Sequence, residues 1–511
     1  MVASLRHPLG WLVGIAIAVI YAPLIPAAVM LVTPAFSLAG WQALFSDPQL
    51  PQAFIATLVS TLIATAGSLL IALCVVVALW PGERWGRLHT RLPWLLAVPH
   101  VAFATSVLLM FAEGGVFYQW CSACSPLLDR YGIGLGLTLA VKESAFVLWA
   151  MYAVLPEKTL AQQWVVLRTL GYSRIQGLFW LVLPAITPAL GAVMLAVVAW
   201  SLSVVDVAII LGPGNPPTLA VLAWQWLSQG DAQQQIKGTL LCLLLLLLLA
   251  LFAALGFIIW RRWHRPVPAA SGVRQPLGAP VVGTTLGWLL PLCGVLCAAA
   301  LVLLADGDSF DFVLFSTSLS LALFSGLIAL TIILLWLEWG PSRGSLWIWL
   351  PLALPALPLV AGQYRIALFM GIDGTYFAVL WGHLLWVLPW MLLVLQPAWR
   401  RLDPRAIVIA RTLGMRRSKI FWTIKCPLLT RPLLTAFATG FSVSMAQYLP
   451  TLWLGAGRFP TLTTEAVALS SGGSTAILAG RALWLLALTA AAFGLAAGLS
   501  RLAGRFRRGL R

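Results

Sequence analysis

Long apolar stretches separated by short polar segments dominate the hydrophobicity pattern of this chain. Twelve of them approach the roughly 20 residues that a helix needs to cross the hydrocarbon core of a membrane. They are residues 11–33, 58–80, 92–111, 133–155, 190–211, 238–260, 284–305, 315–337, 345–362, 376–395, 433–454 and 483–499. The pattern therefore predicts an all-α polytopic membrane protein with about twelve transmembrane helices.

The polar and turn-forming residues repeat once along the chain. Residues 165–219 reappear at 408–462 without a gap, each pair lying 243 positions apart (411 − 168). The repeated residues are Gly, Pro, Arg and Thr rather than Leu, so the repeat preserves loops and backbone shapes. We expect two copies of one six-helix unit, over 1–260 and 283–511. A flexible cytoplasmic linker over 261–282, rich in Pro, Gly, Ser and Arg, joins them.

The composition supports the membrane class, and the charge distribution predicts the orientation. Of the 511 residues 61% are hydrophobic and 9% are charged, whereas soluble domains have roughly 25% charged residues. The net charge of +17 suggests nucleic-acid binding at first sight. If the N-terminus is cytoplasmic, however, 26 of the 32 Lys and Arg residues fall in cytoplasmic segments. This positive-inside bias predicts that both termini are cytoplasmic and that the two repeats are parallel. The expected partner is membrane lipid, and nucleic acid is not expected to bind.

The longest cytoplasmic segments join the fourth and fifth helix of each half, at about 156–188 and 397–432. In the second, Asp403 is a good helix N-cap, Pro404 fits the first helical position, and Gly414 ends the helix. Each segment is predicted to form a short amphipathic helix followed by a glycine turn. A helix of about ten residues is marginal in water. Its apolar face therefore packs on the protein's own helix ends or on another subunit, unless the segment is a plain surface connector.

These two segments resemble the cytoplasmic signature of binding-protein-dependent ABC import permeases. In that family the pattern is Glu-Ala-Ala, a few residues, Gly, nine residues, Ile-x-Leu-Pro. The matching residues are Gly171, Leu181, Leu183 and Pro184 in the first copy and Ala410, Gly414, Ile424 and Pro427 in the second. The two copies on one chain resemble the fused double permeases of the thiamine and ferric-iron systems. The family's acidic residue is replaced by Val165 and Val408, and Cys426 replaces the leucine before the second proline.

The resemblance implies that this segment is a coupling helix and that the fold is that of type I ABC importer permeases. In the family, the coupling helix sits in a groove of a separate ATPase subunit, whose closure swings the pore between inward- and outward-facing states. The residues expected to form the coupling loops are Arg168, Thr169, Leu170, Gly171 and Pro184, and Arg411, Thr412, Leu413, Gly414 and Pro427. The resemblance also implies two copies of the ATPase, a periplasmic solute-binding protein and a location in a bacterial inner membrane.

The chain has no recognisable means of hydrolysing ATP. It contains no G-x-x-x-x-G-K-[ST] phosphate loop and no Gly-Lys dipeptide. It is therefore not expected to be an enzyme, and no cofactor or metal site is expected. Its predicted function is translocation of a small solute, powered by the separate ATPase. Thiamine-like vitamins, ferric iron, polyamines and other small solutes all remain open as the substrate.

A second duplicated motif, L-G-x-G-x-x-P-T-L, closes the fifth helix of each half on the outer face. Because glycine permits turns that other residues cannot make, the motif is consistent with a helix terminator. It is equally consistent with a contact or gate for a loaded binding protein. Its main residues are Gly212, Gly214 and Pro217 in the first half and Gly455, Gly457 and Pro460 in the second.

Few polar residues lie inside the predicted spans. A charge at membrane depth costs roughly 3 kcal/mol or more unless it is paired or hydrated. Lys142 and Glu143 in the fourth helix and His383 in the tenth are therefore expected to face the bundle interior or a cavity. Asp206, with Leu449 at the repeated position, is a candidate for asymmetric contact with the solute. These four polar residues are candidates for lining the translocation path, and interhelical bonding is the alternative.

A twelve-helix secondary transporter is the main alternative, because it also has two six-helix halves. Residues 82–87 superficially resemble the basic loop motif of major-facilitator proteins, but 341–344 in the second half provide no counterpart. The strongest repeats lie between helices four and five instead. A membrane enzyme is disfavoured because H-E-x-x-H is absent and the five histidines are scattered. Cys121 and Cys124 form a C-x-x-C in an outer loop, where a local disulfide is one option.

Overall fold

The computed structural model describes residues 8–112, 115–118, 120–121, 129–155, 158–263, 280–306, 310–340 and 346–506. Within these residues every regular element is a helix and no strand occurs. The all-α prediction is therefore confirmed. Most of the predicted linker lies outside the described residues. Cys121 is disulfide-bonded, and Cys124 lies outside the described residues.

Eight helices of the described chain are long and apolar enough to cross a membrane. The eight are α1 with α2 (Pro8–Tyr21 and Leu24–Val32), α4 (Leu50–Leu79), α8 (Ile133–Val154), α14 (Ala232–Trp263), α15 (Val281–Leu304), α16 (Phe312–Trp339), α19 (Tyr376–Arg400) and α26 (Thr475–Phe506). Each overlaps a stretch predicted from the hydrophobicity pattern, although α4, α14 and α26 begin six to eight residues earlier than predicted. A polytopic membrane protein is confirmed.

The other four predicted spans are each broken into two helices, and the breaks occur in the third and fifth span of both halves. The pairs are α6 and α7 (Pro93–Leu96, His100–Phe111), α11 and α12 (Leu183–Ser203, Asp206–Leu211), α17 and α18 (Leu346–Ala353, Ala356–Met370), and α23 and α24 (Thr430–Met445, Leu449–Leu454). Non-helical backbone is tolerated at membrane depth only where it is buried or lines a cavity. The breaks are thus a first sign of where the cavity lies.

The first helix of each half crosses to the other half. α1 packs on α16 of the second half, and α15 packs on α4, α6 and α7 of the first half. The contact between α15 and α4 is close, because a Cβ on Gly283 would lie 2.0 Å from the backbone oxygen of Cys74. The Arg91 guanidinium also lies 4.3 Å from the centroid of the Trp288 ring. The two sequence repeats are therefore interlocked in space.

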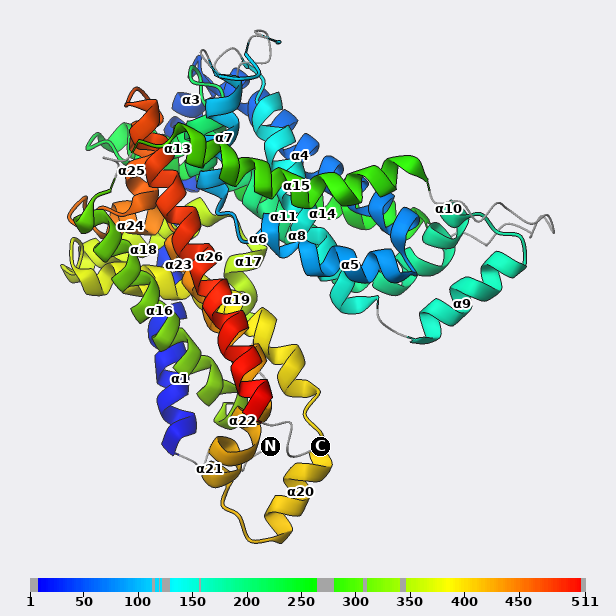
Figure 1. Cartoon of the computed structure of the whole chain (residues 1–511). Coiled ribbons are helices and arrows are strands. Elements are labelled where there is room, and N and C mark those ends of the chain that lie inside the picture. The colour runs from blue at the N-terminus through cyan, green and yellow to red at the C-terminus, as the bar shows by residue number, and fades with distance from the viewer. Residues whose placement is uncertain are drawn as a thin grey trace.

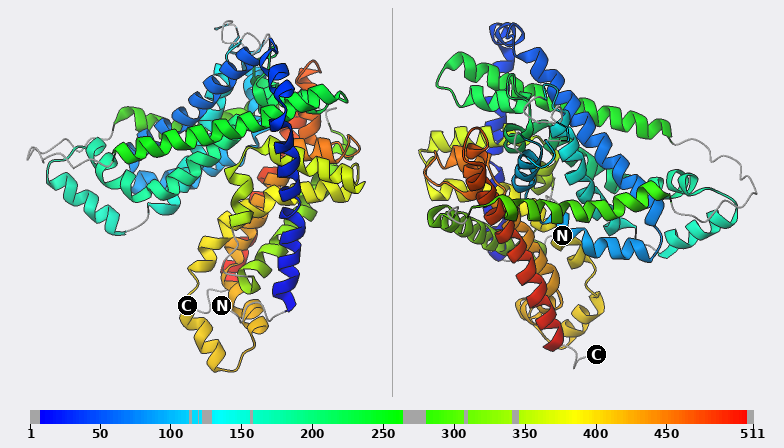
Figure 2. Two further views of the ribbon diagram at one scale, coloured as in Figure 1. Left: turned by 180° about the vertical axis from the view of Figure 1, so that it is seen from behind. Right: turned by 45° about the horizontal axis from the view of Figure 1, so that its top comes forward.

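The molecule is forked, as Figure 1 shows. The arm formed by the first half ends at α9 (Lys158–Thr169) and α10 (Arg174–Gly177). The arm formed by the second half ends at α20 (Pro404–Thr412) and α21 (Arg417–Ile420). The view from behind in Figure 2 shows the same fork. The two predicted coupling helices, α9 and α20, therefore lie at separate tips of the molecule.

The arms meet at the opposite end, where three short helices gather in Figure 1. They are α3 (Leu38–Phe45), α13 (Leu219–Leu227) and α25 (Leu462–Leu469). α13 and α25 directly follow the duplicated L-G-x-G-x-x-P-T-L motif, and the hydrophobicity pattern did not predict them because each is too short to span a membrane.

Candidate coupling loops and translocation cavity

The two coupling loops, residues 158–184 and 404–427, share one backbone design. Gly171 and Gly414 have φ angles of +91° and +76°, a region that L-residues with side chains rarely adopt. In the first loop the Tyr172 amide donates to the Leu167 carbonyl over 3.2 Å, and in the second the Met415 amide donates to the Ala410 carbonyl over 3.0 Å. Both are the six-to-one bonds of a Schellman helix end. The predicted glycine turns therefore have the expected geometry.

The start of the second coupling helix also agrees with its sequence. Asp403 Oδ1 accepts from the Arg405 amide over 2.9 Å, with Pro404 as the first helical residue. The first coupling helix is held by packing, because the buried ring of Trp164 lies 5.3 Å from that of Trp80, centroid to centroid. A Cβ on Gly177 would approach the Trp164 ring to 2.6 Å, so this glycine lets the two segments of the loop pack closely.

Each coupling helix leaves three apolar side chains exposed at its tip, and their positions match between the halves. Every one of them is more than half exposed, although the family pattern places an acid at the first position. They are Val165, Val166 and Leu170 on the first loop and Val408, Ile409 and Leu413 on the second, each pair 243 positions apart (413 − 170). These faces have no partner within the described chain.

One arginine anchors each coupling loop to the second span of its half. The Arg174 Nη1 group donates to the Val77 and Ala78 carbonyls over 3.0 and 3.2 Å, at the end of α4. Arg417, 243 positions later, donates from Nε to Glu338 Oε1 over 2.8 Å, near the end of α16, and also to the Glu338 carbonyl. Sequence reasoning missed these two arginines, although their identical offset was a usable signal.

The second anchor is stronger than the first, because Glu338 adds a buried carboxylate. Its side chain is 2% exposed and also pairs with the ammonium of Lys425. In the first half the matching arginine contacts Val77 instead, which offers no carboxylate. Val182 lies 243 positions before Lys425. A duplicated π-helical turn, Leu178–Val182 and Phe421–Lys425, carries the chain from each anchor into the membrane.

A cavity of about 530 Å³ lies between the two halves and is bordered by the breaks in the four interrupted spans. An acid and base cluster from the first half forms part of its wall. His100 Nε2 lies 2.8 Å from Glu143 Oε1, and the Lys142 ammonium donates to the Leu95 carbonyl over 2.5 Å. Asp206 begins α12, is 6% exposed and also lines the cavity. As expected from their spacing, Lys142 and Glu143 take different partners.

The second half contributes a different wall. At the positions 243 residues after Lys142, Glu143 and Asp206 stand Leu385, Trp386 and Leu449. Trp386 and Leu449 line the cavity, and so do Trp390 and Tyr448. At these repeated positions the first half therefore presents charged groups to the cavity and the second half presents aromatic or apolar ones, although Arg431 of the second half also lines it. A solute in it meets two unlike surfaces despite the repeat.

The structure places the four residues predicted to line the translocation path in two different environments. Lys142, Glu143 and Asp206 line the cavity, whereas His383 lies within the bundle. The two ring nitrogens of His383 are hydrogen-bonded to Ser444 Oγ (2.8 Å) and Thr451 Oγ1 (2.9 Å). This geometry matches the interhelical alternative. The sequence analysis did not single out His100, which is identified by its contact with Glu143.

The duplicated outer motif ends one helix and begins the next. Gly212 and Gly455 terminate α12 and α24, where a Cβ would lie 2.4 and 2.5 Å from a helical carbonyl oxygen. The amide of Leu219, which begins α13, donates to Thr57 Oγ1 over 2.8 Å. The amide of Leu462, which begins α25, donates to Ser318 Oγ over 2.9 Å.

The remaining residues of the motif lie in the intervening turn. Gly457 has a φ of +73°, and Gly214 has open space around it. Pro217 and Pro460 precede Thr218 and Thr461, the N-caps of the two new helices. In each half the motif is therefore a turn that joins two helices rather than a simple stop.

Comparison with known proteins agrees with this geometry. Over all 511 residues, and over the whole length of both chains, the sequence is 62% identical to the inner membrane ABC transporter permease protein YnjC of Escherichia coli (strain K12). No family model matches the chain, and no solved structure matches it. The likeness supports a non-catalytic, multi-pass subunit of an ABC transporter in the inner membrane, rather than a secondary transporter. The chain therefore belongs to the inner membrane ABC transporter permeases.

Proposed function

We propose that this permease imports a small solute, receiving it from a periplasmic binding protein and drawing power from two identical ATP-hydrolysing subunits. The coupling loops and both termini are cytoplasmic in this proposal, in keeping with the positive-inside charge bias. The solute passes through the cavity between the halves. The fork open toward the coupling loops corresponds to an inward-facing arrangement.

The observation that carries the proposal is the matched pair of exposed apolar faces on α9 and α20. Burying a Val, Ile or Leu side chain is worth roughly 1.5–3 kcal/mol, so three such side chains on each face favour contact with a partner. Because both loops present the same residue positions, two copies of one partner satisfy them. Arg405, Arg411 and Arg416 are exposed around the second face, which favours acidic residues on that partner.

The anchors supply a route from the partner to the pore. A coupling helix pushed by its ATPase moves the segment that contains Arg174 or Arg417. Those arginines contact the ends of α4 and α16, so the motion passes to the second span of each half. Closing the fork then changes the walls of the cavity. This route requires that the loops be rigid at their glycine turns.

The test replaces the two glycines of the turns. Gly171→Val/Gly414→Val forces a β-branched side chain into a positive φ, which distorts the end of each coupling helix. A Cβ on Gly414 meets no atom within 4 Å, so at this position the bundle itself is spared. The wild-type chain, tagged and solubilised mildly, is expected to co-purify with an ATP-hydrolysing subunit, and the double variant is expected to lose it together with solute uptake.

Gly86→Val is the matched control. Gly86 lies in the short helix α5 (Glu83–Arg91) on the same side of the membrane, also with no atom within 4 Å of its Cβ position but without a positive φ. This variant should retain the ATPase subunit. Normal uptake and normal co-purification in the double glycine variant would show that these loops do not couple the pore to an ATPase.

A further inference from the structure

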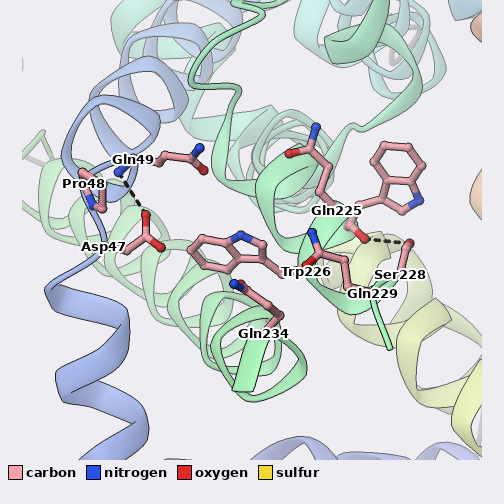
Figure 3. A pocket seen from close by; sticks show the side chains of 9 residues that line it. Asp47, Pro48, Gln49, Gln225, Trp226, Ser228, Gln229 and Gln234 are labelled. Carbon is pink, nitrogen blue, oxygen red and sulfur yellow. Dashed lines mark hydrogen bonds between the residues drawn. The ribbon is translucent and has the colours of Figure 1, made fainter. Parts of the chain in front are cut away.

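A second pocket, of about 590 Å³, lies at the end of the molecule opposite the coupling loops. It is bounded by the turn between α3 and α4, by α13, and by the start of α14 (Figure 3). Its outer rim is exposed at Pro48, Gln225 and Gln229. The pocket is separate from the central cavity, because the two have no lining residue in common.

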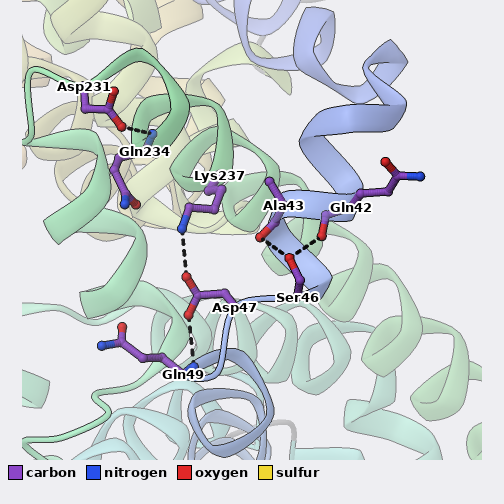
Figure 4. Close-up of polar contacts among 8 residues, drawn as sticks. All are labelled: Gln42, Ala43, Ser46, Asp47, Gln49, Asp231, Gln234 and Lys237. Carbon is purple, nitrogen blue, oxygen red and sulfur yellow. Dashed lines mark hydrogen bonds and ion pairs between the residues drawn. The ribbon is translucent and has the colours of Figure 1, made fainter.

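The charged groups of the pocket neutralise one another. The Lys237 ammonium lies 2.8 Å from Asp47 Oδ2, with both side chains largely buried. Asp47 Oδ1 also accepts from the Gln49 amide over 3.0 Å, as Figure 4 shows. The same ammonium lies 4.5 Å from the centroid of the buried Trp226 ring, which holds that indole in place. The pocket therefore offers a fixed aromatic surface without a net charge from this pair.

Side-chain carboxamides supply most of the remaining polarity. Gln49, Gln225, Gln229 and Gln234 surround Trp226 in Figure 3. Each carboxamide presents both donors and an acceptor. The Oε1 atom of Gln234 is buried and has no hydrogen-bond partner within the described residues, although such groups are normally satisfied. The chemistry suits a neutral ligand that itself presents donors and acceptors side by side, as peptide groups do.

The second half has no equivalent pocket chemistry. At the positions 243 residues after Trp224, Gln225 and Trp226 stand Val467, Ala468 and Leu469, and Ile477 replaces Gln234. The coupling faces at the other end of the molecule are matched between halves. A partner present once, without twofold symmetry, needs unlike contacts on the two halves, whereas a partner present twice needs like ones.

We propose that this pocket receives a loop of the periplasmic solute-binding protein, held through its peptide groups by the carboxamides and packed against Trp226. The inference rests on the proposed function, which supplies a single soluble partner on this face. A free small solute fits less well, because binding sites for small molecules enclose most of the ligand surface and this rim is open. The binding protein is thereby assigned a preferred side, on the first half.

The pocket is joined to the contact between the halves. Ser228, on its rim, accepts from Trp453 Nε1 of the second half over 3.1 Å. Trp224, on its wall, lies 6.4 Å from Tyr448, centroid to centroid, and Tyr448 lines the central cavity. A loop that seats on α13 therefore acts on residues that hold the outer ends of the two halves together.

The experiment uses the full chain with its ATP-hydrolysing subunits in lipid nanodiscs. The probe is the secreted solute-binding protein that co-purifies with the tagged wild-type chain. Gln225→Ala/Gln229→Ala removes two exposed carboxamides and leaves the packed interior unchanged. Two lost hydrogen bonds should raise the binding-protein concentration for half-maximal stimulation of ATP hydrolysis by about tenfold or more. Basal hydrolysis and the co-purification of the ATPase should not change.

Two controls use the second half. Ser471→Ala alters the counterpart of Ser228, 243 positions on, and should shift the half-maximal concentration by less than about twofold. A photo-cross-linking phenylalanine analogue at position 225 should capture the binding protein in cells, and the same analogue at position 468 should not.

Three results overturn the assignment. They are an unchanged half-maximal concentration in the double variant, equal cross-linking from positions 225 and 468, and stimulation by free solute without the binding protein. A failure of the proposed function has a different signature, since the wild-type chain would then co-purify with no ATPase. If the wild-type complex responds to the binding protein and the double variant responds equally well, only the docking site is wrong.

Discussion

At the tips of the two arms, Val165 and Leu170 of the first half correspond to Val408 and Leu413 of the second, in residue type as well as in exposure. In the cavity the correspondence fails, because Glu143 of the first half faces a second half that has Trp386 at the repeated position. Both regions descend from one repeated unit. Under the proposed function, the repeat is preserved where one kind of partner is met twice, and it has diverged where a single solute or binding protein is met.

The arginine anchors of the coupling loops are preserved between the halves in one part and have diverged in another. Arg174 and Arg417 are conserved between the repeats, whereas Val77 replaces Glu338 as the contact of the arginine and Val182 lies at the position that matches Lys425. The outer faces of the loops are therefore alike, but a buried ion cluster holds the second loop to its span, whereas the contacts of Arg174 in the first loop include the Val77 and Ala78 carbonyls.

The largest effect is expected from Glu338→Ala. This change leaves the ammonium of Lys425 buried without its carboxylate, and breaking a buried pair on one side costs about 3–5 kcal/mol. Val77→Ala, at the residue that Arg174 contacts in the first half, should cost only about 1–2 kcal/mol. Thermal unfolding of the purified protein, followed by tryptophan fluorescence, measures both. Glu338→Val/Lys425→Val recreates the first-half composition and should recover part of the loss. Equal destabilisation by the two alanine variants would refute the difference in anchoring.

Next in size is the effect of Glu143→Gln on transport. The change removes the carboxylate that faces His100 and leaves the side-chain volume unchanged, so uptake is expected to fall about tenfold or more with a normal amount of protein in the membrane. Trp386→Phe, at the repeated position of the aromatic wall, keeps a ring there and should change uptake by no more than about twofold. Wild-type uptake by the Glu143 variant would remove that residue from the translocation path.

Smaller effects are expected when the anchoring arginines are altered. Arg174→Ala and Arg417→Ala should each lower binding-protein-stimulated ATP hydrolysis about tenfold, about 1.4 kcal/mol, while the ATPase still co-purifies. Lysine replacements should distinguish the anchor of the first half from that of the second. Arg417→Lys should recover more activity than Arg174→Lys, because Glu338 offers a carboxylate to an ammonium, whereas the end of α4 offers the Val77 and Ala78 carbonyls. Equal recovery would mean that both anchors act through the backbone alone.

The smallest effect concerns the thiol of Cys426 in the second loop. Burial, reinforced by the Glu338 carboxylate, raises the pKa of this thiol to about 11. The thiolate is the reactive form, so at neutral pH labelling by a maleimide should be slow and should accelerate about tenfold per pH unit on raising the pH toward 11. In a variant with Cys426 as its sole cysteine, Glu338→Gln should lower the pKa and speed labelling at pH 8. A rate that does not depend on pH would contradict this protonation state.

Local patterns were sufficient for much of the architecture. Apolar stretches predicted the long helices, and the 243-residue offset predicted both coupling loops with their glycine turns at Gly171 and Gly414. Asp403 and Pro404 marked the start of α20 correctly. These features depend on hydrophobic length, on backbone conformation and on capping, all of which are encoded within a few neighbouring residues. The twelve-span count stays a prediction, because the third and fifth spans of each half are broken.

The site could be predicted only in part. Lys142, Glu143 and Asp206 were selected because polar groups are costly in a membrane, and the structure brings all three to the cavity. The same argument selected His383, which is instead hydrogen-bonded between helices. A polar residue within a span is satisfied by either environment, so sequence alone does not distinguish them. The roles of His100 and Glu338 were identified only from their contacts with Glu143 and Arg417, which lie 43 and 79 positions away in the chain.

By itself, then, the sequence determined the membrane class, the doubled plan and the conformation of the coupling turns, because each depends on composition or on residues close together in the chain. The tertiary structure decided the exchange of first helices, the breaks that surround the cavity, the unequal anchors and the carboxamide pocket beside α13. Those features arise from contacts between distant segments, such as α15 with α4 and Lys237 with Asp47. Local periodicity carries no record of such contacts, because burial and pairing are satisfied only when the whole bundle has formed.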